Sequence, residues 1–326
     1  MKIFLFILPL LSQPEKINIL IEKGLEASYV EDYQKSRLYY DSIVKLYPEH
    51  PAGYFYKAAL LQLYMMDFVT DSKEKDYFRL MKRTQKICKL QLKKDKYDKW
   101  ANFFYGSSLV FTTIYQGWHR RYWKAFTTGI SAYDYMKRVV KKDRFFYDAY
   151  LLLGAYDYFS GRVSKYLLGI KPFGSIKQGI EELKLVKNKG RFYNITATQA
   201  LSWIYTEEKN YKNAILLAKA LVNKYPHGRT FRWQYAASLS KAGKIEEAFK
   251  VYTNLIKDIK KYQNGNITNI SQCNLEIAKL YLKKNDTTKA KIFLKKVLIH
   301  KKDIRRDLGY SDIVKEANKL IKRISH

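Results

Sequence analysis

Six consecutive residues near the middle of the chain combine aromatic rings with cationic side chains. They follow Gly117 and are Trp118, His119, Arg120, Arg121, Tyr122 and Trp123. Trp, Tyr and Arg are the residue types that dominate the binding energy of protein interfaces. This segment therefore predicts partner binding rather than bond-making chemistry. The predicted contact residues are Trp118, Arg120, Arg121, Tyr122 and Trp123.

A second interpretation of the same segment stays open, in which its rings only fill an irregular layer of the fold. Trp118 and Trp123 are five residues apart, so on a helix their directions differ by about 140°. One indole could therefore pack inward while the other lies at an exposed edge. The solvent accessibility of the two rings distinguishes a binding surface from a core.

The remaining candidates for catalysis or metal binding form no recognisable arrangement. The sequence has no Gly-rich phosphate loop, no His-Glu-x-x-His and no paired-cysteine motif, and its five histidines are scattered. The adjacent Glu181 and Glu182 should point to different helix faces, so we expect no carboxylate dyad from them. We therefore expect no enzyme, no cofactor and no metal ion.

Small residues recur at a spacing that paired helices require. A small residue is followed twelve positions later by a second one in four sets, which are Gly24 and Ser36, Ser202 and Ala214, Ala236 and Ala248, and Ala278 and Ala290. Small side chains at both positions let two antiparallel helices approach closely. With a period of about 34 residues, the pattern predicts a helical solenoid, in which each helix pair buries its apolar face against its neighbours.

These repeats resemble the tetratricopeptide repeat. The similarity is best over residues 195–228, where Leu201, Ser202, Tyr205, Ala214, Leu221 and Pro226 stand at positions that this family fills with similar residues. It is fair over residues 17–50 and 229–303, and weak between 53 and 191. The family's Trp near the start of helix A is absent, so the copies are divergent. The resemblance implies an α-solenoid that contacts proteins, and it implies no chemistry.

The expected fold is an all-α, right-handed α-solenoid of about six helix pairs. Residues 14–191 should form divergent repeats with insertions, and residues 192–326 should form regular repeats ending in a capping helix over 311–324, with Ser311 as its N-cap. The expected interruptions are residues 116–128, which depart from the repeat pattern, and residues 161–174, the longest predicted loop.

Asp157 is the last predicted contact residue. It occupies the position at which the cleaner repeats carry Tyr205, Leu239 and Tyr281. A carboxylate at such a position is costly to bury unless it is paired. We expect the partner to be a cation, supplied by Arg120, Arg121 or Arg162.

The charge balance leaves two functions open. With 61 Lys and Arg against 30 Asp and Glu, the formal net charge is +31. Compositional drift combined with solubility explains this excess in one interpretation. In the other, Lys-rich helices over residues 70–99 and 283–306 bind an anionic polymer, nucleic acid or a membrane surface. The first interpretation leaves a non-catalytic scaffold that holds a protein or peptide of unknown identity in the solenoid groove.

The N-terminus predicts export. Lys2 precedes an apolar run over residues 3–11, followed by Ser12, as in a secretory signal peptide. The run of about nine residues is too short to span a bilayer, which needs about 20. Residues 1–13 are therefore a predicted signal peptide, and the mature chain a periplasmic or extracellular protein without a membrane span. The alternatives are an apolar capping helix and a cytoplasmic protein, although Pro9 and Pro14 disfavour an unbroken helix.

Overall fold

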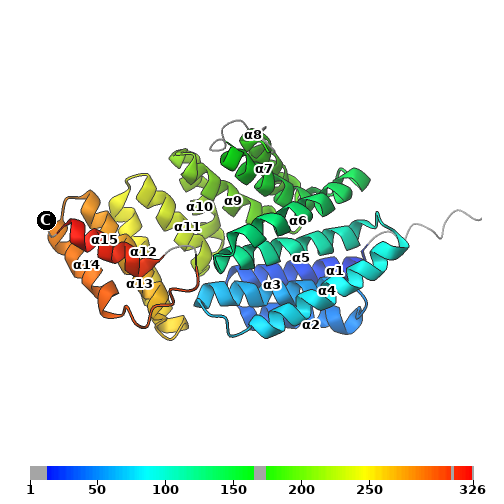
Figure 1. The fold of residues 1–326 in the computed structure, drawn as a ribbon, viewed down its shortest axis with the longest axis horizontal. Helices are drawn as coiled ribbons and strands as arrows, with labels where there is room; N and C mark the ends of the chain where they lie inside the picture. Colours follow the sequence, from blue (N-terminus) through cyan, green and yellow to red (C-terminus); the bar gives the residue numbers. More distant parts are fainter. Residues whose placement is uncertain (1–12, 165–173, 310–311, 325–326) are drawn as a thin grey trace, which may run out of the picture. The chain divides into compact units, whose positions relative to one another are not determined.

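The computed structural model describes residues 13–164, 174–309 and 312–324. Within these residues the chain is helical and contains no strand (Figure 1). The helices are α1 (Glu15–Tyr29), α2 (Tyr33–Leu46), α3 (Pro51–Phe68), α4 (Glu74–Lys94), α5 (Lys99–Trp118), α6 (Tyr122–Lys142), α7 (Tyr150–Ser164), α8 (Ile176–Lys189), α9 (Asn194–Glu207), α10 (Tyr211–Lys224), α11 (Arg229–Lys241), α12 (Ile245–Tyr262), α13 (Ile267–Lys283), α14 (Thr287–Ile299) and α15 (Ile313–Arg323). A short 3₁₀ helix over Tyr147–Ala149 precedes α7.

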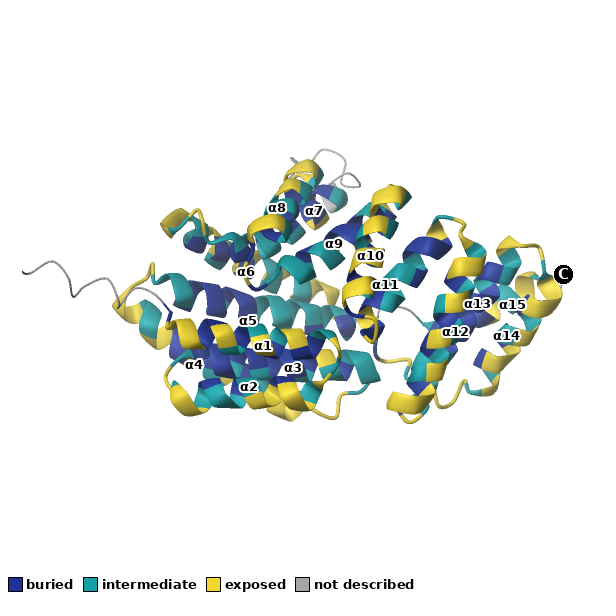
Figure 2. Cartoon of the chain, turned by 180° about the vertical axis from the view of Figure 1, so that it is seen from behind, coloured by how far each residue is buried: buried dark blue, intermediate teal, exposed yellow. Residues whose placement is uncertain are grey.

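The helices pack in sequence-adjacent pairs, which confirms the predicted all-α helical-repeat fold. The described residues contain seven consecutive helix pairs followed by α15, which is one pair more than the sequence predicted. Buried residues lie along the sides of the helices that face their neighbours, and exposed residues cover the remaining sides (Figure 2). None of the described helices combines the length and the apolar composition needed to cross a bilayer. The predicted signal peptide lies, except for Gln13, outside the described residues.

The chain divides into two compact units. The first comprises residues 1–62, 74–112 and 127–193, and the second comprises 63–73, 113–126 and 194–326. The second unit therefore contains the last turns of α3 and α5 and the first turn of α6, in addition to α9–α15.

The small residues identified in the sequence lie where paired helices touch. Ser36 Oγ on α2 donates to the Gly24 carbonyl on α1 at 2.8 Å. Ser202 Oγ on α9 donates to the Ala214 carbonyl on α10 at 2.9 Å. A Cβ atom on Gly24 would lie 2.2 Å from the ring of Tyr40, so glycine is required at this contact. The predicted register is confirmed for both helix pairs.

The C-terminal helix covers the apolar side of the last pair. Ile313, Val314 and Ala317 of α15 are buried in one cluster with Leu294 and Val297 of α14. The predicted capping helix therefore exists, but its start differs from the prediction. Asp312 rather than Ser311 is the N-cap, because its side chain accepts the N–H of Lys315 at 3.0 Å.

Of the two predicted interruptions, the first is mostly helical, and the second falls mostly outside the described residues. Residues 116–128, expected to depart from the repeat, are the end of α5 and the start of α6, joined by only three residues. Helix α5 passes through Gly106 and Gly117 without a break. In the predicted loop over 161–174, residues 161–164 are the last turn of α7, and residues 165–173 lie outside the described residues.

Candidate partner-binding site

Trp118 and Arg120, two of the predicted contact residues, hold together parts of the second unit. Trp118 is the last residue of α5 and is 4% exposed. Its carbonyl accepts the N–H of Gly309 at 3.1 Å, and the Gly309 carbonyl accepts Arg120 Nε at 3.3 Å. Gly309 has φ +87°, a conformation that favours glycine. These contacts attach the segment before α15 to the end of α5, so Trp118 has a structural role.

The next three residues of the cluster face solvent. Arg121 is exposed, Tyr122 is 59% exposed and Trp123 is 76% exposed. The Trp123 ring lies 5.9 Å from the ring of Phe126, one turn further along α6. The structure thus divides the predicted cluster into a buried ring at Trp118 and an exposed aromatic–cationic surface at the start of α6.

Asp157 lies in the first unit, whereas the aromatic–cationic cluster belongs to the second. The six predicted contact residues therefore do not share one compact unit. Asp157 is 4% exposed, and its carboxyl group faces that of Glu182 rather than an arginine. Arg162, one of the expected partners, donates instead to the Tyr158 hydroxyl at 2.9 Å.

Sequence reasoning missed this pairing. Glu181 pairs with Lys184 on its own helix, whereas Glu182 meets a carboxyl group from another helix. The available signal was the pair of glycines, Gly154 and Gly179, because each stands three residues before one of the two acids. Glycines on two neighbouring helices indicate a close backbone approach, and polar side chains one turn away are then brought together.

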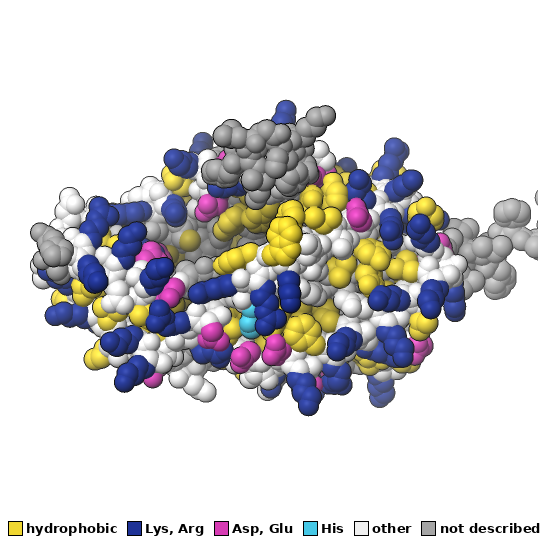
Figure 3. Space-filling view, viewed as in Figure 1, with side chains coloured by type: hydrophobic (Ala, Val, Ile, Leu, Met, Phe, Trp, Pro, Cys, Tyr) yellow, Lys and Arg dark blue, Asp and Glu magenta, His cyan; other side chains and the backbone are white. Residues whose placement is uncertain are grey.

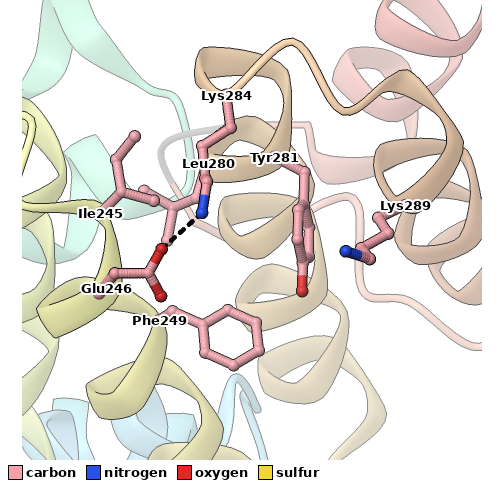
Figure 4. A pocket seen from close by; sticks show the side chains of 7 residues that line it. All are labelled: Ile245, Glu246, Phe249, Leu280, Tyr281, Lys284 and Lys289. Atoms are coloured by element: carbon pink, nitrogen blue, oxygen red, sulfur yellow. Dashed lines mark hydrogen bonds and ion pairs between the residues drawn. The ribbon is translucent and has the colours of Figure 1, made fainter.

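A second candidate site is a cavity of about 200 Å³ in the second unit, formed by the start of α12, the end of α13 and the start of α14 (Figure 4). Its apolar lining consists of Ile245 and Phe249 from α12 and Leu280 and Tyr281 from α13. The Phe249 and Tyr281 rings are 5.8 Å apart in an edge-to-face arrangement. On its other side Tyr281 stacks on Phe293 at 5.5 Å. The aromatic rings are therefore fixed by mutual packing.

Charged side chains line the rim of this cavity. Lys284 Nζ lies 2.6 Å from Glu246 Oε1, as the dashed line in Figure 4 shows. Hydrogen bonding to Lys284 lowers the pKa of Glu246, and the same contact raises the pKa of Lys284. Lys289 Nζ lies 5.6 Å from the centre of the Tyr281 ring. Exposed ion pairs contribute little to stability, so the rim can exchange this pair for a partner's carboxylate.

The sequence did not single out this cavity, because its residues lie in the most regular repeats. Phe249 and Tyr281 adjoin core positions of the repeat pattern, and their residue types alone do not show whether they line a cavity or belong to the core. No cluster of three or more His, Cys, Asp or Glu side chains suited to a metal ion occurs in the part of the chain that the structure describes.

Comparisons with known proteins show no family for this chain. No protein-family model matches the chain, and no curated protein matches it. Among solved structures, it is similar to the crystal structure of the yeast Tom70, with 11% identity over 96% of each chain and a TM-score of 0.39. Likeness at this level carries no information about function.

Proposed function

We propose that this chain is a non-catalytic scaffold of divergent tetratricopeptide-like repeats that binds a protein or peptide segment. The observation that carries the proposal is the cavity between α12, α13 and α14. Its volume suits one large apolar side chain. Its lining also matches pockets that anchor a partner, which combine an apolar interior with a few charged groups at the edge. Lys284 and Lys289 at the rim favour acidic residues beside that anchor.

The exposed start of α6 supports the same kind of function. Tyr122 and Trp123 present large aromatic surfaces next to Arg121, and such residues are enriched at interaction hot spots. This surface and the cavity both lie in the second unit, although nothing requires a single partner to contact both.

A peptide probe tests the cavity directly. The probe is a fluorescein-labelled acidic pentapeptide, Asp-Glu-Phe-Glu-Asp, compared with the same peptide carrying Ala in place of Phe. Fluorescence anisotropy should show at least tenfold tighter binding of the Phe peptide. Tyr281→Ala should remove most of this preference, whereas Lys295→Ala, an exposed lysine outside the cavity, should not change it. Equal binding of both peptides would reject the cavity as the anchor site.

A second candidate function rests on a separate observation in the first unit. Six cationic residues follow one face of α4 at alternating spacings of four and three residues, and all are exposed: Lys75, Arg79, Lys82, Lys86, Lys89 and Lys93. No Asp or Glu occurs between Tyr77 and Lys94. At about 1.5 Å per residue this basic stripe is about 27 Å long. Lys and Arg side chains also occur across the face drawn in Figure 3.

The basic stripe favours binding of a linear polyanion. Like charges one turn apart destabilise a helix by about 0.2–0.5 kcal/mol per pair, and a bound polyanion would relieve that repulsion. The probe is a single-stranded oligonucleotide of 20 thymidines, titrated at several salt concentrations. Changing Lys75, Lys82, Lys86 and Lys93 to Gln should reduce the slope of log K against log salt by about 3. The matched control changes Lys212, Lys219, Lys250 and Lys257 to Gln, which are exposed and lie outside both Lys-rich segments. A loss of slope equal in both variants would indicate net charge alone.

A further inference from the structure

Helices α7 and α8 approach each other closely enough for backbone to touch backbone. A Cβ atom on Gly179 would lie 2.5 Å from the Gly154 carbonyl oxygen, and one on Gly154 would lie 2.8 Å from the Gly179 carbonyl oxygen. Real Cβ atoms do not reach such distances, so both positions require glycine. This contact fixes the two helices side by side within the first unit.

The close approach brings two carboxyl groups together one turn away. Asp157 on α7 is 4% exposed, and Glu182 on α8 is half-buried. The two carboxyl groups face each other, and Gln178 Nε2 donates to Glu182 Oε1 at 3.0 Å. No donor from the described residues reaches Asp157 Oδ2 or Glu182 Oε2. Ionised carboxylates only accept hydrogen bonds, so a hydrogen bond between the two groups requires one proton.

The surroundings of the pair favour the protonated form. Burial raises the pKa of Asp157, and burial together with the charge of Asp157 raises the pKa of Glu182 to about 7. From α6, Tyr133 and Lys137 face the pair, and Lys137 is the cation that opposes the rise at Asp157.

Tyrosines from two helices enclose the pair further. The ring of Tyr133 stacks on Tyr156 of α7 at 4.2 Å. Burial is the main cause that raises the pKa of both hydroxyls, and the negative charge of the nearby acids raises it further. Tyr150 of α7 also faces Glu182, and Asp134 of α6 adds negative charge beside Tyr133 and Tyr156. Acid groups thus outnumber Lys137 around the two carboxyls, which favours keeping a proton there.

We propose that Asp157 and Glu182 form a proton-binding site that holds α7 against α8 while one proton is shared between them. When the proton is lost, two carboxylates face each other with no donor between them, and their repulsion opens the helix pair. This site is independent of the proposed partner-binding cavity, which lies in the second unit.

The sign of the pH effect follows from the direction of the shifts. Both pKa values in the folded protein lie above the ordinary values of 3.8 and 4.5. The folded chain therefore binds more protons than the unfolded chain between about pH 4 and pH 7. The stabilisation is complete below the ordinary values and is lost as the pH rises through about 7. Above that pH, opening of the helix pair should increase by up to about tenfold per pH unit, the limit for one proton.

Amide hydrogen exchange of the full chain at pH 6 and pH 8, corrected for the intrinsic rates, tests this site. In the unmodified protein, exchange within α7 and α8 should be at least fivefold faster at pH 8 than at pH 6. Glu182→Gln supplies a permanent N–H donor to Asp157, so its exchange should be equally slow at both pH values. Glu181→Gln, a change at the exposed neighbouring acid paired with Lys184, should behave like the unmodified protein.

A second variant keeps the test decisive if Glu182→Gln does not fold. Asp157→Asn reverses the direction of donation and should also remove the pH dependence. Carbon-13 NMR of selectively labelled glutamate side chains gives an independent reading, with one carboxyl titrating near pH 7. Exchange that is equal at both pH values in the unmodified chain, or a Glu182 titration near its ordinary value, would overturn the proposal.

Discussion

Asp67 and Arg229 form a buried ion pair inside the second unit, with Arg229 Nη2 2.5 Å from Asp67 Oδ2. The side chains are only 9% and 8% exposed. Asp67 lies near the end of α3, and Arg229 is the first residue of α11. Gln263 Nε2 and Asn269 Nδ2 donate to the Asp67 backbone carbonyl at 3.0 and 2.7 Å. The turn between α12 and α13 and the first turn of α13 therefore cap the end of α3.

Removing one partner of this pair should destabilise the second unit strongly. In Asp67→Ala the guanidinium of Arg229 stays buried without its carboxylate, and such losses cost about 3–5 kcal/mol. Chemical denaturation followed by circular dichroism measures the change. Asp76→Ala is the matched control, because its ion pair with Arg79 is exposed and should contribute less than about 1 kcal/mol. Equal effects of the two substitutions would show that the buried pair has no special role.

Overpacking the small contact positions should also be costly. Ala214 and Ala248 are completely buried between paired helices. A leucine at either position requires space that the packed backbones do not have, so each variant should lose about 1–3 kcal/mol of stability. Thermal unfolding measures the loss. Leu216→Ala is the control, because Leu216 is 64% exposed on the same helix as Ala214. Unchanged melting of both leucine variants would contradict the repeat register.

The sequence was sufficient to predict the helix pairs and their register, because both depend on local spacing. Ser36 and Ser202 stand at a fixed offset from their contacts, and their hydroxyls donate to carbonyls of the paired helix. Residues 116–128, predicted to depart from the repeat, are helical except for the three residues that join α5 and α6. Their helical propensity is sufficient to continue α5 and begin α6.

Partners distant in sequence could not be predicted in the same way. The contact of Asp157 with Glu182 depends on how closely α7 and α8 pack, and local spacing carries no such distance. The attachment of Gly309 to Trp118 joins segments almost two hundred residues apart. Charge complementarity suggested arginine partners for Asp157, but backbone packing at Gly154 and Gly179 placed a second acid there.

Export is a further proposal, and it rests on the apolar run over residues 3–11. If this run is a signal peptide, the mature protein begins between Ser12 and Lys16 and is found outside the cytoplasm. Intact-mass measurement of protein purified from fractionated native cells checks both statements. Full-length chain recovered from the cytoplasm would show that the apolar run is retained.

The two tryptophans of the aromatic–cationic cluster should respond oppositely to truncation. Trp118 is buried, and its loss leaves a large cavity where the segment before α15 meets the end of α5, so Trp118→Ala should cost about 3–5 kcal/mol of stability. Trp123 is 76% exposed, so Trp123→Ala should change stability by no more than about 0.5 kcal/mol. If the start of α6 contacts a partner, Trp123→Ala should instead weaken binding by about 2 kcal/mol or more.

The pair of measurements separates a structural role from a binding role at these two positions. Denaturation gives the stability change, and crosslinking of a photoreactive group placed at Tyr122 in native cell extract identifies contacts of the exposed surface. Trp123→Ala should abolish those crosslinks, whereas Leu216→Ala, at an exposed residue of α10, should leave them intact. A large loss of stability in Trp123→Ala would mean that its ring belongs to the fold. The proposal that the exposed start of α6 binds a partner would then be rejected, because the Trp123 ring would have the same structural role as the Trp118 ring.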